Sequence, residues 1–120
     1  MTLQELYKRI DGNYDNVVGR LRSEERIEKF VLLFRKDQSY QECMKGMELG
    51  EWKLAFRAVH TLKGVSLNLS FDRMFRISDQ LTETLRNSEI ERAKELLPEF
   101  QSCYETHLKE INAYAEEKSA

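Results

Sequence analysis

The chain has little that would interrupt a helix: one proline and only five glycines in 120 residues. Because these two residue types are the strongest helix breakers, their scarcity leaves room for long, unbroken helices. No apolar run approaches the roughly 20 residues that a membrane-spanning helix needs. Glycine-rich phosphate loops, kinase nucleotide motifs and serine-hydrolase motifs are all missing, so the chain has no visible means of using ATP itself.

Cysteine and histidine are equally sparse. Cys43 and Cys103 lie far apart and form no Cys-x-x-Cys motif. Since no secretory signal is present, we expect both to be reduced thiols on helices and the protein to be cytoplasmic. The two histidines, His60 and His107, lack the spacing of a zinc pair and have no obvious third ligand, so no metal site and no cofactor are expected.

The charge balance argues against one class of partner. The formal net charge is −2, and the basic residues are scattered along the chain instead of forming a massed patch. Nucleic-acid binding usually needs a concentrated basic surface, so this balance disfavours it. Hydrophobic residues make up 41% of the chain and charged residues 33%, a profile typical of a helix-rich globular domain that lies outside the membrane.

Apolar residues recur at helical spacing in four long segments. We expect these helices to span residues 24–49, 51–67, 71–86 and 89–115. Their connections are too short for anything but antiparallel neighbours, which predicts one all-α domain with an antiparallel up-down four-helix bundle over residues 23–115. Short helices within residues 1–22 are expected to cap one end, and residues 116–120 to form a frayed tail.

Local signals refine the helix ends. The polar residues 36–39 should either bend or split the first long helix. Ser70 is a candidate N-cap for the third helix, and Ser88 with Glu91 fits a capping box for the fourth. Pro98 should either kink the fourth helix or begin a second segment, since proline is tolerated in the first turn of a helix but not in its interior.

The most informative stretch surrounds His60, in the second half of the second long helix. Val59 and Leu62 fall on its apolar stripe, whereas His60 lies about 110° from the centre of that stripe, at the edge of the solvent side. Lys63 at i+3 and Gly64 at i+4 adjoin the imidazole. A neutral imidazole is a nucleophile near neutral pH, and an ammonium group steadies an anion carried on it. Glycine inside a helix is unfavourable, which indicates close approach by a partner.

These residues match a known pattern. Residues 60–64 read His-x-Leu-Lys-Gly and are followed by Leu69 and Ser70, which resembles the motif of histidine phosphotransfer (HPt) domains, H-x-L-K-G with a later aliphatic-glycine pair. The run 56–64 is also similar to the phosphotransfer domain of chemotaxis histidine kinases. Ser70 departs from the family, which usually has glycine there. The resemblance in helix pattern extends over about residues 23–111.

The resemblance implies both a bundle fold and a place in a phosphorelay. His60 would accept a phosphoryl group, at the far ring nitrogen, from a receiver-domain aspartate and pass it to another receiver. The receiver would supply Mg²⁺ and an acidic pocket, so the chain would be a carrier without kinase activity of its own. The expected partners are response-regulator receiver domains, a hybrid histidine kinase, or both. We expect a monomer that stands alone, because no further domain follows the short polar tail.

Other residues are expected to assist His60. Lys63, Gly64 and Gln80 are the candidates for proximity to the phosphoryl group, the last because family members often place a glutamine on that helix. The docking candidates form a half-exposed apolar rim and a pair of cations that could steer an acidic pocket; they are Lys53, Phe56, Arg57 and Leu67. Plainer interpretations exist: Lys63 as a solvated charge, Gly64 as a helix–helix contact and Phe56 as core.

The sequence leaves other functions open. A degenerate HPt bundle could dock receivers without being phosphorylated, although the intact His60 argues against this. The chain could instead be the phosphotransfer module of a chemotaxis-type kinase, or a small metal-binding bundle, which would lack paired ligands. His60 could also be an ordinary histidine at the boundary of a helix. His107 lies near the core stripe of the last helix with no motif around it, so we expect a packed structural histidine.

Overall fold

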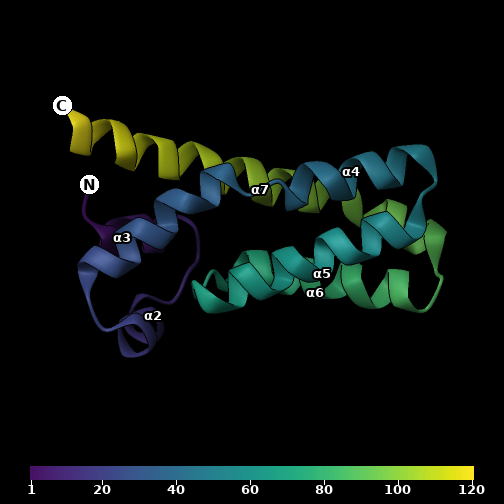
Figure 1. Ribbon diagram of the computed structural model, residues 1–120, viewed down its shortest axis with the longest axis horizontal. Coiled ribbons are helices and arrows are strands. Elements are labelled where there is room, and N and C mark those ends of the chain that lie inside the picture. The colour runs from purple at the N-terminus through teal and green to yellow at the C-terminus, as the bar shows by residue number, and fades with distance from the viewer.

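The computed structural model describes residues 1–120 as seven α-helices and one short 3₁₀ turn. The bundle consists of four helices: α4 (Ser39–Leu49), α5 (Trp52–Asn68), α6 (Asp72–Arg86) and α7 (Ile90–Ser119). They run up and down, with α5 between α4 and α6 and with α7 against α6 (Figure 1). The predicted all-α antiparallel bundle is therefore confirmed. None of the helices combines the length and the apolar character that crossing a bilayer requires.

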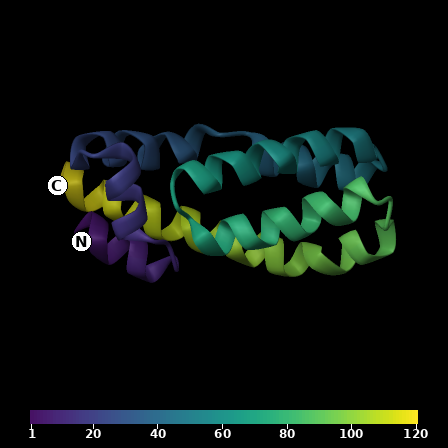
Figure 2. The same cartoon turned by 90° about the horizontal axis from the view of Figure 1, so that it is seen from below.

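The N-terminal helices gather at one end of this bundle, where both chain termini also lie (Figure 2). They are α1 (Leu3–Arg9), α2 (Tyr14–Leu21) and α3 (Glu24–Leu33). The side chain of Thr2 caps α1 and that of Asn13 caps α2, each by accepting a backbone N–H from the first turn. Since α1 packs against α7, the two helices within residues 1–22 close this end of the bundle as predicted, and α3, which was expected to belong to the first bundle helix, joins them there.

The first long helix of the prediction is split in two. After α3 the chain makes one 3₁₀ turn, η1 (Phe34–Lys36), and then an extended residue at Asp37. The carboxylate of Asp37 accepts the backbone N–H of Ser39 at 2.8 Å and so starts α4. Of the two outcomes expected for residues 36–39, splitting is the correct one. The break lets α3 lie against α2 while α4 packs along α5.

Two predicted caps are wrong. The N-cap positions of α6 and α7 are Phe71 and Glu89, and neither makes a side-chain capping bond. Ser70 and Ser88 stand one residue earlier in left-handed backbone, with φ of 56° and 59°. A left-handed residue closes the preceding helix, which is why these serines end α5 and α6 instead of starting the helices that follow.

The last helix runs further than predicted. It is continuous from Ile90 to Ser119, so Pro98 lies inside it and does not begin a separate segment. The helix also includes most of the expected tail. Its end is held by tertiary contacts: the Tyr114 hydroxyl donates to Glu28 at 3.1 Å, and the N-terminal ammonium lies 2.6 Å from Glu117. Fraying was predicted from the local sequence alone, which does not reveal these contacts with distant residues.

His107 is part of the core, as expected. It is completely buried, and its ring lies 6.3 Å and 5.3 Å, centroid to centroid, from Phe34 and Phe71. Its Nδ1–H donates to the carbonyl of Cys103 at 2.8 Å, while Nε2 has no partner. Burial lowers the pKa of His107 to about 4, so the ring is neutral at physiological pH. Cys43 on α4 and Cys103 on α7 are free thiols on helices, as predicted, and the structure buries both.

Candidate functional site

His60 lies on α5 and is exposed, whereas its neighbours Val59 and Leu62 are completely buried. The helical rotation of about 100° per residue produces this contrast, since it turns His60 out of the stripe that packs on the core. One turn earlier on the same face, the Phe56 ring lies 5.9 Å from the His60 ring, centroid to centroid, with 30° between the planes. The imidazole thus has one face against an aromatic ring and its other edges open to partners.

Lys63 follows His60 by one turn and forms an ion pair with α6. Its Nζ lies 2.9 Å from Oδ1 of Asp79. Sequence reasoning named Gln80 for this neighbourhood, but α6 presents Asp79 to Lys63. Gln80 is exposed and stands about 100° around the helix from Asp79. Its proximity to a phosphoryl group therefore stays a prediction. Asp79 was missed because the register between two helices is set by their packing.

The surroundings of Gly64 are open. Apart from its chain neighbours and the backbone of its own helix, a Cβ atom built on Gly64 would meet no atom within 4 Å. Gly46 on α4 shows the opposite case, because a Cβ there would lie 2.7 Å from the backbone nitrogen of Ala55 on α5. Gly46 thus permits a close helix–helix contact, whereas Gly64 makes none within this chain. Gly64 leaves a strip of bare backbone one turn from His60.

A cleft with a basic and aromatic lining lies on the N-terminal side of His60. The Arg86 guanidinium, at the end of α6, sits 5.1 Å above the centroid of the Phe56 ring. Phe56 therefore contacts both His60, on its own helix, and Arg86, on α6. The cleft brings together three of the four predicted docking residues, and its lining consists of Trp52, Lys53, Phe56, Arg57, Leu85, Arg86 and Ser88.

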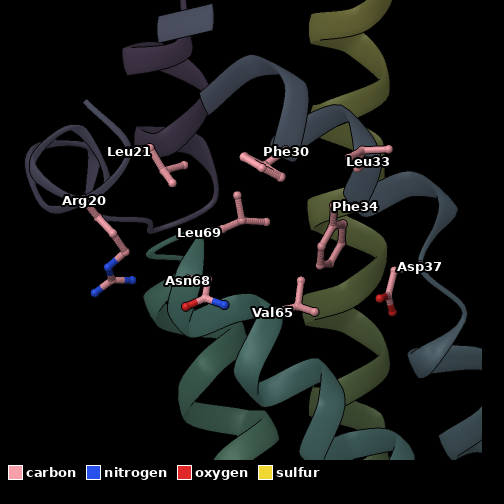
Figure 3. A pocket seen from close by; sticks show the side chains of 9 residues that line it. All are labelled: Arg20, Leu21, Phe30, Leu33, Phe34, Asp37, Val65, Asn68 and Leu69. Carbon is pink, nitrogen blue, oxygen red and sulfur yellow. The ribbon is translucent and has the colours of Figure 1, made fainter. Parts of the chain in front are cut away.

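The fourth docking candidate, Leu67, lies at the other end of α5 and is 49% exposed. An apolar groove of about 470 Å³ opens beside this end, between it and the N-terminal helices (Figure 3). Phe30 and Leu33 stand exposed along it, although large apolar side chains of this kind are usually buried. Its lining consists of Arg20, Leu21, Phe30, Leu33, Phe34, Asp37, Val65, Asn68 and Leu69.

The turn after α5 shows why Ser70 can replace the glycine that is usual there. Its φ of 56° lies in the left-handed region that glycine adopts most easily. The serine hydroxyl donates to Oδ1 of Asn16 at 2.6 Å, and the Ser70 carbonyl accepts the Asn13 N–H at 2.8 Å. These bonds tie the turn to α2. The backbone shape expected of glycine is therefore retained.

The fold and the site together describe a small helical module that presents one histidine to partners. The family model described as Hpt domain matches residues 22–113, and the chain belongs to this family. Hpt domains are histidine phosphotransfer modules of two-component systems; they are carriers and not kinases, and they interact with receiver domains and histidine kinases. Comparisons with curated proteins and with solved structures give no significant match.

Proposed function

We propose that this protein is a standalone phosphoryl carrier of a two-component phosphorelay, with His60 as the residue that carries the group. The observation that supports this most directly is the exposed His60 imidazole beside a glycine whose surroundings are open. His107, the other histidine, is completely buried. A receiver domain could therefore reach only one of the two imidazoles without unfolding part of the core.

The proposed step is a displacement at phosphorus. The lone pair of the unprotonated ring nitrogen of His60 forms a P–N bond while the P–O bond to the receiver's aspartate breaks. The carboxylate leaves with the electron pair of that bond, and the proton on the second ring nitrogen can pass to solvent. The transition state is loose, with charge on the equatorial oxygens, so positioning and electrostatic stabilisation account for most of the acceleration.

Each neighbour of His60 has a part in this scheme. The Phe56 ring, 5.9 Å away, restricts the orientation of the imidazole before the partner arrives. Lys63 brings a positive charge to the equatorial oxygens, because it lies one turn further along the same helix. Gly64 leaves clearance for the partner's backbone. Mg²⁺ and the acidic pocket belong to the receiver.

Docking is proposed to use both ends of the exposed face of α5. Lys53, Arg57 and Arg86 surround the cleft next to His60 and favour the approach of an acidic receiver pocket. At the other end, the groove beside Phe30 and Leu33 is continuous with α5 through Val65 and Asn68. An apolar segment of the same receiver would cover it and bury side chains that are exposed in the free protein.

A relay assay tests this function. One receiver is phosphorylated, purified and mixed with this protein and a second, unphosphorylated receiver from the same cell. We expect label to pass through the protein to the second receiver, and no transfer with the His60→Gln variant. Direct transfer between the receivers at the same rate with either variant would contradict a carrier role. Unlabelled protein that still binds receivers would indicate an adaptor.

A further inference from the structure

The ammonium group of Lys63 is already engaged in the unmodified protein. Its Nζ lies 2.9 Å from Oδ1 of Asp79, and the two side chains are 25% and 41% exposed. Lys63 is also the cation that follows the exposed His60 by one turn. We propose that Asp79 is a positioning residue, which holds the Lys63 ammonium group against α6 while His60 is unmodified and gives it up when His60 carries a phosphoryl group. This rests on the proposed function.

The exchange follows from the charges. A phosphoryl group on His60 carries up to two negative charges and three acceptor oxygens, whereas the Asp79 carboxylate carries one charge. Exposed ion pairs hold weakly, because water screens them and both side chains lose freedom. The Lys63–Asp79 pair is partly exposed on both sides, so a stronger anion one turn away can displace the carboxylate.

Other charged groups around this face do not replace Asp79. On α5, Lys53 and Arg57 line the cleft on the other side of His60. On α6, Arg86 already lies over the Phe56 ring, and its Nε is 3.3 Å from Glu83. The carboxylate bound to Lys63 is that of Asp79. Competition for this one ammonium group is therefore between Asp79 and whatever anion His60 carries.

The competition has a functional consequence. Without a carboxylate partner, Lys63 would pair with the phosphoryl group as soon as it arrived and would stabilise the phosphorylated form. Asp79 weakens that pairing, since part of the attraction must first replace an existing ion pair. The phosphorylated and free forms are thus brought closer in free energy, which suits a carrier that must both accept and release its group.

The test uses phosphoramidate as the donor, so that no partner protein is needed. The His60 nitrogen attacks phosphorus, the P–N bond of phosphoramidate breaks, and ammonia leaves. The ³¹P chemical shift of the labelled protein is then followed against pH. A freed Lys63 disfavours protonation of the phosphoimidazole group. We therefore expect Asp79→Asn to raise its acid ionisation constant about two- to fivefold, the range that an exposed ion pair supports.

The controls distinguish an effect that acts through Lys63 from a general effect of removing one negative charge. Asp79→Glu should keep the wild-type titration, because it retains a carboxylate at this position. Glu110→Gln removes the same charge from another interhelical pair that is partly exposed, with Arg9 at 3.4 Å, and should leave the titration unchanged. Lys63→Met should lower the ionisation constant. Adding Asp79→Asn to Lys63→Met should then have no further effect, because Asp79 acts through Lys63.

Two results would overturn the inference while leaving the proposed function intact. One is an unchanged titration in Asp79→Asn. The other is an equal shift when Asp79→Asn is made in the Lys63→Met background, which would show direct repulsion between carboxylate and phosphoryl group. A wild-type protein that takes no acid-labile phosphate, although circular dichroism shows it folded, would instead remove the proposed function and this inference with it.

Discussion

The ring of Phe56 packs on that of His60, with 5.9 Å between centroids and 30° between planes. A contact of this kind limits the rotamers of an exposed side chain, which would otherwise sample several orientations. Phe56 is itself in contact with the Arg86 guanidinium, at the end of α6. The imidazole is therefore oriented by two helices, although it extends into solvent from only one.

Replacing Phe56 by leucine should slow labelling of His60. The substitution keeps an apolar side chain but loses the ring stacking, which is worth about 0.5–1.5 kcal/mol, so the rate with phosphoramidate should fall about two- to tenfold. Phe30→Leu is the matched control, because Phe30 is exposed on α3 and away from His60. Equal rates for Phe56→Leu and the wild type would show that Phe56 does not orient the imidazole.

Gly46 on α4 and Gly64 on α5 should respond to alanine in opposite directions. Gly64→Ala should stabilise the protein by about 0.5–1 kcal/mol, because the added Cβ meets open space and alanine favours helix. Gly46→Ala should destabilise it by about 1–3 kcal/mol, since its Cβ would press on Ala55. Urea denaturation measures both. A loss of stability in Gly64→Ala would contradict the open surroundings.

The bulkier change Gly64→Gln should leave the fold intact and block the approach of a receiver. The side chain would project into the space that the partner's backbone is proposed to occupy. Affinity for a receiver, measured by calorimetry, should fall at least tenfold, an effect of about 1.4 kcal/mol. Undiminished affinity would show that receivers dock elsewhere.

Burial of His107 makes stability depend on pH. Its pKa falls from an ordinary 6.5 to about 4 in the folded protein, chiefly because burial disfavours the charged ring. Between those pH values the unfolded chain binds the extra proton and the folded protein does not, so stability is lost as pH falls through this window. The loss should reach about 3 kcal/mol.

The free energy of unfolding is measured against pH for the wild type and for His107→Phe. The loss of stability between pH 6.5 and 4 that His107 causes should be absent from the variant. Asp11 and Arg73 also influence the ring, so the difference between the two proteins is the relevant quantity. A direct NMR titration covers the case in which the variant fails to fold. A His107 ring that becomes charged near pH 6.5 in the folded protein would refute the expectation.

The groove in Figure 3 should contribute to the binding of a receiver and not to the phosphorylation of His60. Leu33 is 45% exposed beside it, so Leu33→Lys should leave the fold and the phosphoramidate labelling unchanged. Receiver affinity should fall about fivefold or more if this side chain is buried by the partner. Leu49→Lys is the control, because Leu49 is 56% exposed at the end of α4 and lines neither concavity. Equal affinities for the two variants would remove the groove from the docking surface.

Periodicity within a helix was sufficient to predict the bundle, the exposed His60 and the buried His107. Each of these depends on which residues of a single helix face the core and which face solvent. Features set by two helices were missed. The proximity of Gln80 to a phosphoryl group stays a prediction, whereas the pairing of Lys63 with Asp79 depends on the register of α6 against α5. The stack of Arg86 on Phe56 depends on it as well.

Turns were predicted less well than helices. Ser70 and Ser88 have the composition of helix starts, yet their left-handed backbone makes them helix ends. For Ser70 a sequence signal did exist, because the position usually holds glycine and a left-handed φ is what glycine permits. The extension of α7 to Ser119 had no such signal, since the contacts of Tyr114 and Glu117 are with residues near the other end of the chain.

The central claim is that one exposed imidazole carries the phosphoryl group. The most direct measurement is to incubate the protein with phosphorylated receivers and to map acid-labile phosphate by mass spectrometry under alkaline conditions. We predict one modified residue, His60, and no phosphate on His60→Gln, which should keep the helical content of the wild type because the position is exposed. Acid-labile phosphate that persists on His60→Gln, or that maps to another residue, would contradict the account.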